Sequence, residues 1–177
     1  LWPDHAIQGS ANAALHPDLV HDRIELIIRK GFDPKIDSYS AFYENDRTTT
    51  TGLDAWLRAR GVRRVFLAGL ATDYCVAWSA EDAVRHGFEV VVIEDACRGI
   101  GLPLPSGGTT MDAAQRRLAE LGVAFTTSAG GARGQPSIQA SGSGGRAGTS
   151  RSNPAGGGDR SCNACRMTAS VAASSKR

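Results

Sequence analysis

The feature that most limits how this chain of 177 residues can fold is a repeated alternation of short apolar runs and helical segments. Apolar, β-branched runs predict buried strands, and apolar positions that recur every three or four residues predict helices. The predicted strands are residues 25–29, 64–68, 89–93 and 123–126, and the predicted helices lie between residues 51 and 61, over 74–86 and over 111–121. Strands that are apolar throughout are typical of parallel sheets covered on both faces. We therefore predict an α/β fold with three α/β/α layers around a parallel, Rossmann-like sheet.

Two of the predicted helices begin with a possible capping box, in which a side-chain oxygen accepts a hydrogen bond from the backbone N–H three residues later. Thr51 with Asp54 has this form, and so does Thr109 with Asp112. Gly61 is placed to end the first of these helices. These residues set the expected start of both helices.

The composition changes after about residue 128. Residues 1–129 contain 13 basic and 17 acidic side chains, whereas residues 130–177 contain 7 basic and 1 acidic and are rich in Gly, Ser and Ala. A segment with so few large apolar side chains cannot bury enough surface to offset its ordering entropy. We predict one domain over residues 1–129 and a disordered, low-complexity tail over residues 130–177.

Charge and hydropathy argue against several classes of partner. Basic residues are scattered through the tail rather than gathered with aromatic residues on a folded face, which argues against nucleic-acid binding. No apolar run approaches the roughly 18 residues that a membrane helix needs, so we expect no membrane partner. The four cysteines lack the spacing of a secreted disulfide framework, so we expect a cytoplasmic protein.

Lys30 and Cys75 each come soon after the end of a predicted strand. Because ligands of open parallel sheets bind beyond the carboxyl ends of the strands, these two side chains could face one pocket. Cys75 also starts a predicted helix, where unpaired backbone N–H groups and the helix dipole favour a thiolate. Taken alone, an intracellular cysteine is more often a small buried hydrophobic residue, and that alternative stays open.

Four parts of the chain resemble, in the same order, segments of the nicotinamidases (pyrazinamidases), which are cysteine hydrolases of the isochorismatase-like superfamily. Agreement of four separate segments is far more specific than a match to one motif, and the resemblance spans about residues 1–126. The segments are Leu1–His5 with Leu15–Pro17, Arg29–Phe32 with Asp37–Phe42, Gly69–Val76, and Asp95–Gly99.

The resemblance implies an enzyme that hydrolyses linear amides with an Asp/Lys/Cys triad. Cys75 would be the nucleophile that forms a thioester, with Lys30 beside it and an aspartate that carries the proton to the departing ammonia. The backbone N–H groups of Ala71 and Cys75 would hold the oxyanion, and the Leu70–Ala71 peptide bond would be cis. The implied substrates are nicotinamide, which is deamidated to nicotinate in NAD salvage, and pyrazinamide-like amides.

The resemblance also implies a divalent metal (Zn, Fe or Mn) in the intact parent protein, with His5 as one ligand. Trp2 and Tyr39 match aromatic positions that pack on the pyridine ring, and Tyr74 lies beside the nucleophile and would line the pocket. Without the resemblance, His5 would belong to a surface turn and the aromatic residues to ordinary packing.

Several neighbouring residues have structural roles in this interpretation. We expect Asp73 to fix the turn before Cys75, Cys97 to be a buried structural thiol, and Asp95 with Arg98 to fix a loop.

The first strand of the family, its catalytic aspartate and its Asp-x-His metal ligands have no match in residues 1–177. The chain alone would then have two of three triad members and one metal ligand, so we expect it to be inactive in isolation. An unpaired sheet edge would favour a homo-oligomer. The alternatives are another isochorismatase-like hydrolase or amidase, and a non-catalytic remnant that only binds partners.

Overall fold

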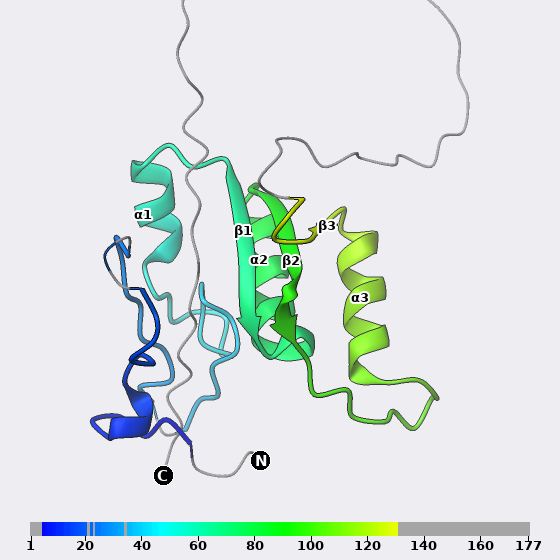
Figure 1. Cartoon of the computed structure of the whole chain (residues 1–177), viewed down its shortest axis with the longest axis horizontal. Helices are drawn as coiled ribbons and strands as arrows, with labels where there is room; N and C mark the ends of the chain where they lie inside the picture. The colour runs from blue at the N-terminus through cyan, green and yellow to red at the C-terminus, as the bar shows by residue number, and fades with distance from the viewer. Residues whose placement is uncertain (1–4, 21, 23, 34, 131–177) are drawn as a thin grey trace, which may run out of the picture.

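The computed structural model describes residues 5–20, 22, 24–33 and 35–130 (Figure 1). The predicted tail, apart from residue 130, and Trp2 lie outside the described residues. The elements in chain order are a 3-10 turn at Ala11–Ala13, α1 (Leu53–Ala59), β1 (Arg64–Leu70), a π-helical turn at Thr72–Val76, α2 (Ala77–Arg85), β2 (Glu89–Arg98), α3 (Thr110–Glu120) and β3 (Ala124–Thr126).

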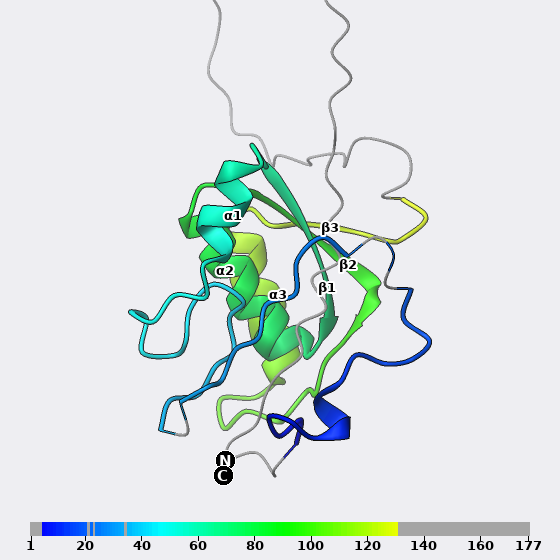
Figure 2. The same cartoon turned by 90° about the vertical axis from the view of Figure 1, so that its left-hand side faces the viewer.

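The three named strands form one parallel sheet in the order β1-β2-β3. Val65 of β1 pairs with Val90 of β2, and Val92 of β2 pairs with Phe125 of β3. The helices α1, α2 and α3 lie on the same side of the sheet, and the amino-terminal segment runs on the other side (Figure 2). This arrangement confirms the predicted α/β fold with a parallel sheet, and it brings the carboxyl ends of the strands to one edge.

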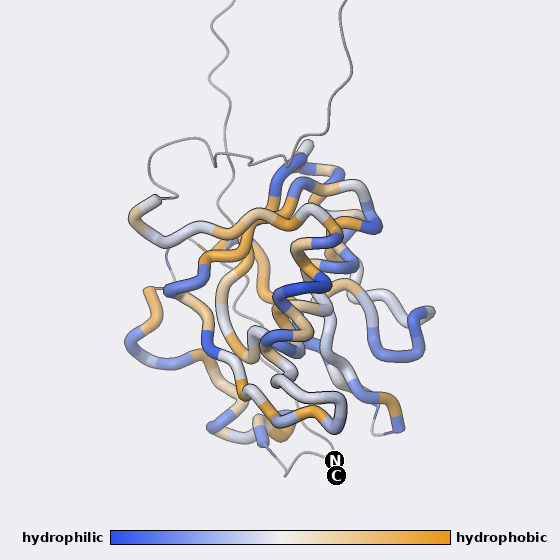
Figure 3. Tube along the Cα trace, turned by 90° about the vertical axis from the view of Figure 1, so that its right-hand side faces the viewer, coloured by the Kyte–Doolittle hydropathy of each residue, from blue (hydrophilic) through white to orange (hydrophobic). Residues whose placement is uncertain are grey.

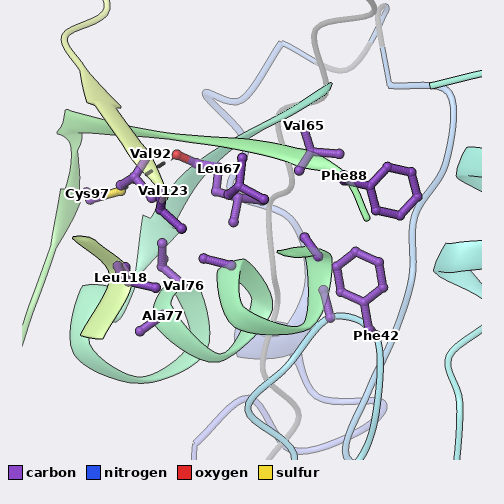
Figure 4. Close-up of a cluster of buried hydrophobic side chains, with 14 of the residues drawn as sticks. Phe42, Val65, Leu67, Val76, Ala77, Phe88, Val92, Cys97, Leu118 and Val123 are labelled. Carbon is purple, nitrogen blue, oxygen red and sulfur yellow. Dashed lines mark hydrogen bonds between the residues drawn. The ribbon is translucent and has the colours of Figure 1, made fainter. Parts of the chain in front are cut away.

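The core lies between the sheet and α2 and α3 (Figure 4). Ala77, Ala80 and Ala83 of α2 are fully buried, and their small side chains let the helix approach the strands closely. Val92 of β2 and Leu118 of α3 fill the space that remains. Figure 3 shows the hydrophobic residues along the strands at the centre, with hydrophilic residues on the outer loops and helix faces.

Three predicted strands, 64–68, 89–93 and 123–126, are confirmed as β1, β2 and β3, and β2 is longer than its hydropathy indicated. The apolar run ends at Ile93, but pairing with β1 resumes at Cys97 and Arg98 after a register shift between Leu67 and Gly69. Two of the three residues between, Glu94 and Asp95, are charged, so the sequence pattern gave no sign that the strand continues. Backbone pairing with β1 extends β2 to the edge of the sheet where Cys75 lies. A hydropathy pattern gives no information about such pairing.

The predicted buried strand at residues 25–29 is wrong. These residues are extended, with alternating half-buried and exposed side chains, and Ile27 is 52% exposed. A strand needs a hydrogen-bonded neighbour, and the named strands of the described structure do not include this segment. The apolar run therefore lies beside the core without joining the sheet.

One capping box is confirmed and the other is wrong. Thr109 and Asp112 form both reciprocal hydrogen bonds at the start of α3. At α1 the N-cap is Gly52, because the Thr51 hydroxyl donates to the carbonyl of Ala41 at 2.6 Å instead of capping in the predicted way. Gly61, with φ of +67°, follows the end of α1 as predicted. Across the described residues, every helix is too short or too polar to cross a membrane.

Candidate active site

Cys75 lies in the tight turn that joins β1 to α2. The chain leaves β1 at Leu70, passes through the predicted cis peptide bond to Ala71, and enters the π-helical turn that contains Cys75. The Ala71 carbonyl accepts hydrogen bonds from the N–H groups of Tyr74 and Val76, both at 3.1 Å. Cys75 is thus held, half-buried, at the carboxyl end of β1 and at the start of a helix, as the sequence predicted.

Lys30 reaches this turn from a segment 45 residues earlier in the chain. Its ammonium nitrogen Nζ lies 3.8 Å from Cys75 Sγ and also donates to the carbonyl oxygen of Ser38. The side chain is 1% exposed. Burial lowers the pKa of Lys30, and attraction to Cys75 and to Glu44 opposes that effect. The predicted proximity of Lys30 and Cys75 is confirmed, while their catalytic roles stay predictions.

The loop over residues 31–50 is held to both sides of the site. Glu44 Oε1 accepts a hydrogen bond from the Gly31 N–H at 2.9 Å, which closes the loop at its base. The Ser79 hydroxyl of α2 donates to the Cys75 carbonyl at 2.6 Å and accepts from the Ala41 N–H at 2.9 Å. Ser79 therefore ties the turn that carries the thiol to the loop. Glu44 and Ser79 were not predicted as site residues, because neither stands out in the sequence by spacing or hydropathy.

Three half-buried aromatic residues pack together beside the thiol. The ring centroids of Tyr39 and Tyr74 are 5.7 Å apart and those of Tyr39 and Trp78 are 5.3 Å apart, both in edge-to-face contacts. The Arg47 guanidinium lies 4.6 Å from the Trp78 ring centroid, which fixes the outer side of the cluster. Trp78 was also missed, although its spacing of four residues from Tyr74 places both on one helix face.

Asp73 fixes the turn before Cys75, as predicted. Its buried carboxylate accepts hydrogen bonds from the backbone N–H groups of Ile100 and Gly101, each at 3.0 Å, and from the Thr110 hydroxyl. Burial by itself raises the pKa of Asp73, but these hydrogen bonds outweigh it, so the pKa lies below the usual 3.8. Cys97 is 5% exposed, and burial raises its pKa, which fits the predicted structural role.

We expect Asp73→Asn to destabilise the fold at neutral pH by about 1–3 kcal/mol, because the amide has no charge and presents a donor to backbone donors. A carboxylate whose folded pKa is depressed stabilises the fold above its unfolded pKa, and this stabilisation is lost as pH falls through the folded pKa. The difference in the free energy of unfolding between wild type and Asp73→Asn should therefore become smaller as the pH falls.

Urea denaturation at several pH values between about 3 and 7 measures this gap. Asp22→Asn, which changes an exposed aspartate, is the control. Its free energy of unfolding should stay close to that of wild type at every pH measured. An equal difference in the free energy of unfolding at both ends of the pH range would contradict the role given to the Asp73 charge.

The described residues do not form the predicted divalent-metal site by themselves. His5 is exposed, and residues 5–20, 22, 24–33 and 35–130 contain no group of three or more His, Cys, Asp or Glu side chains that could hold a metal. A metal bound to a single imidazole would exchange readily with water. His5 as a metal ligand stays a prediction.

An open hollow of about 380 Å³ lies on the amino-terminal segment. Gln8 to Ser10, Ala13, Ala14, Arg29 and Phe32 line it. Lys30 and Cys75 are not among its lining residues, so we do not identify this hollow with the site around the thiol.

Three comparisons with known proteins bear on the site. The family model described as the isochorismatase domain matches residues 1–129. The chain is 53% identical to a nicotinamidase of Acinetobacter baylyi over 102 aligned residues. These aligned residues are 58% of this chain and 48% of that protein. The chain thus spans about half the length of the curated relatives that it matches.

Two solved structures extend this similarity to the fold. A protein from L. infantum, solved in complex with nicotinate, is 40% identical with a TM-score of 0.66, and the match covers 73% of this chain and 62% of that one. A pyrazinamidase of Pyrococcus horikoshii, solved in complex with zinc, is 34% identical with a TM-score of 0.57, and the match covers 72% and 63%. Both similarities rest on sequence as well as on shape.

Proposed function

Since the chain belongs to the isochorismatase family, we propose that the protein is an amidohydrolase that converts nicotinamide to nicotinate and ammonia. The observation that carries the proposal is the 3.8 Å contact between Lys30 Nζ and Cys75 Sγ. An ammonium held against a thiol at the start of a helix favours the thiolate, which is the form that attacks a carbonyl carbon. Relatives named nicotinamidase, and a structure that holds nicotinate, support the choice of substrate.

The proposed reaction proceeds through a thioester on Cys75. The thiolate attacks the carboxamide carbon and forms a C–S bond, while backbone N–H groups of Ala71 and Cys75 stabilise the oxyanion. The C–N bond then breaks, and the nitrogen takes up a proton and leaves as ammonia. Water cleaves the thioester and releases nicotinate. In the family mechanism an aspartate supplies the proton, and among the described residues no carboxylate is paired with Lys30 or Cys75 in that role.

We propose that the aromatic cluster recognises the pyridine ring. Tyr39 follows Ser38 and Tyr74 precedes Cys75 in the chain, and their rings pack edge to face with centroids 5.7 Å apart. A flat heteroaromatic amide fits such a site because ring stacking orients the carboxamide toward the thiol. Trp2 and His5 are proposed to complete ring binding and a metal site in the whole protein.

The test is ammonia release from three amides: nicotinamide, pyrazinamide and benzamide. The proteins compared are this chain and a chimera in which its segment matched by the Acinetobacter baylyi nicotinamidase replaces the corresponding segment of that relative. We expect little release by the chain alone, clear release by the chimera from nicotinamide and pyrazinamide, and much less from benzamide, which lacks the ring nitrogen.

Each outcome has a distinct meaning. A folded chimera that hydrolyses none of these amides would refute the nicotinamide assignment and favour another isochorismatase-like hydrolase. Equal rates on benzamide and nicotinamide would refute recognition of the pyridine ring. Full activity of the chain alone would refute the expectation that it is inactive in isolation.

A further inference from the structure

Residues 42–51 form a short hairpin between the candidate site and α1. Tyr43 and Thr50 pair as an antiparallel bridge, and the Glu44 N–H donates to the Thr49 carbonyl at 2.9 Å. These bonds are local to the hairpin. They shape it, but they do not attach its turn to the rest of the fold.

The turn of the hairpin holds the segment that carries Tyr39. The Asn45 N–H donates to the carbonyl of Asp37 at 2.7 Å, and the Asn45 side-chain oxygen accepts from the Tyr39 N–H at 3.1 Å. These two bonds lie on either side of Ser38, whose carbonyl accepts from Lys30 Nζ. The position of the Tyr39 ring beside the thiol therefore depends on where the turn of the hairpin lies.

Arg47 is the residue of this turn that attaches it to α2. Its Nη1 donates to Oδ1 of Asp82 at 2.5 Å, and its guanidinium lies 4.6 Å from the Trp78 ring centroid. Asp82 is 2% exposed, so its carboxylate needs cationic partners, and Arg85 of the same helix also donates to Oδ1 at 2.9 Å. Because Trp78 packs on Tyr39, Arg47 contacts both the helix and the aromatic cluster.

The backbone of Arg47 indicates that this side chain is present for its contacts. Its φ is +63°, in the left-handed region that favours glycine and that other residues seldom adopt. A glycine would suit the turn without strain, but it would make neither the ion pair nor the ring contact. The contacts of the guanidinium therefore compensate for a strained backbone.

We propose that Arg47 is a positioning residue for substrate binding. Through Asp82 it pins the turn of the hairpin to α2, and it thereby holds Tyr39 where the ring of the amide is recognised. The inference rests on the proposed function, since it takes the aromatic cluster as the ring-binding part of the site. Arg47 touches no reacting atom in this scheme. The competing explanation is that the hairpin keeps its place without the ion pair.

Hydrogen exchange of Arg47→Met separates the two explanations. Methionine removes the guanidinium, and Arg85 still pairs with Asp82, so the buried carboxylate keeps a cation. We expect the N–H groups of Tyr39 and Asn45 to exchange with deuterium about tenfold faster in folded Arg47→Met than in wild type, because the hairpin opens more often. NMR of the chain measures this exchange residue by residue.

Arg60→Met is the matched control. Arg60 makes the same two kinds of contact, an ion pair with Glu25 at 2.7 Å and a ring contact with Trp56 at 4.9 Å. Both charged side chains of that pair are half-exposed, and neither belongs to the hairpin. Exchange at the two N–H groups in Arg60→Met should therefore equal that of wild type. Exchange as slow in folded Arg47→Met as in wild type would overturn the proposal.

Asp82→Asn tests the ion pair from its other side and covers the case in which Arg47→Met does not fold. The amide keeps the size of the side chain and an acceptor oxygen but loses the charge, so exchange at Tyr39 should again become faster. If the two residues act as a pair, Arg47→Met adds little in the Asp82→Asn background. Unchanged exchange in folded Asp82→Asn, or fully additive effects, would overturn the pin through this ion pair.

The effect on substrate binding is measured with the chimera. Ring stacking acts in the ground state as well as in the transition state, so Arg47→Met should raise KM for nicotinamide about tenfold and change kcat less than about threefold. Arg60→Met should change neither constant. An unchanged KM would overturn the role of Arg47 in substrate binding. A chimera that releases no ammonia would refute the proposed function, while the exchange measurements still decide whether Arg47 pins the hairpin.

Discussion

Replacing Cys75 with alanine should reduce ammonia release from nicotinamide by at least about a thousandfold in the chimera, or in any form of the protein that shows the activity. The reason is that the proposed thioester cannot form without the sulfur, and a neighbouring ammonium at 3.8 Å has no nucleophilic role of its own in this scheme. Oxyanion stabilisation and substrate binding would leave only a small residual rate.

Cys97→Ala is the matched control for this prediction. Cys97 is buried, its sulfur faces the Leu67 carbonyl at 4.0 Å (Figure 4), and burial raises the pKa of its thiol. We expect near-normal ammonia release from Cys97→Ala. Mass spectrometry of the acid-quenched chimera should show a nicotinoyl adduct on the peptide with Cys75 and none on the peptide with Cys97. Retained activity in folded Cys75→Ala would exclude covalent catalysis by this residue.

Replacing Leu118 with alanine should lower the free energy of unfolding by about 2–5 kcal/mol. Leu118 is 1% exposed and packs from α3 into the core between α2 and the sheet (Figure 4). Truncation removes buried apolar surface and leaves a cavity, because the alanines of α2 are too small to fill it. A domain of this size has little stability in reserve, so the loss is a large fraction of the total.

The control is Leu121→Ala at the end of the same helix. Leu121 is 39% exposed, so its truncation removes fewer contacts and should cost no more than about 0.5 kcal/mol. Urea denaturation of the chain, followed by circular dichroism, measures both variants. Equal losses for Leu118→Ala and Leu121→Ala would contradict the packing of α3 described here.

The sequence predicted the helices and most strands well because each has a local signal. The apolar runs at 64–68 and 89–93 mark β1 and the first half of β2, and Thr109 with Asp112 marks the start of α3. Local signals also misled. The apolar run at 25–29 looks like a strand, but strand formation depends on a neighbour that sequence periodicity cannot identify. Thr51 looks like a cap, but its hydroxyl binds a carbonyl from another loop.

For the candidate site, the sequence by itself determined that Lys30 and Cys75 follow apolar runs and that Asp73 and Tyr74 directly precede the thiol residue. Only the tertiary structure decided that Glu44 and Ser79 join the same site and that Trp78 packs on Tyr39. The physical reason is that burial, charge compensation and ring contact arise between segments far apart in the chain. A glutamate that is ordinary in its local sequence becomes part of the site only when folding buries it and its carboxylate accepts the hydrogen bond from the Gly31 N–H.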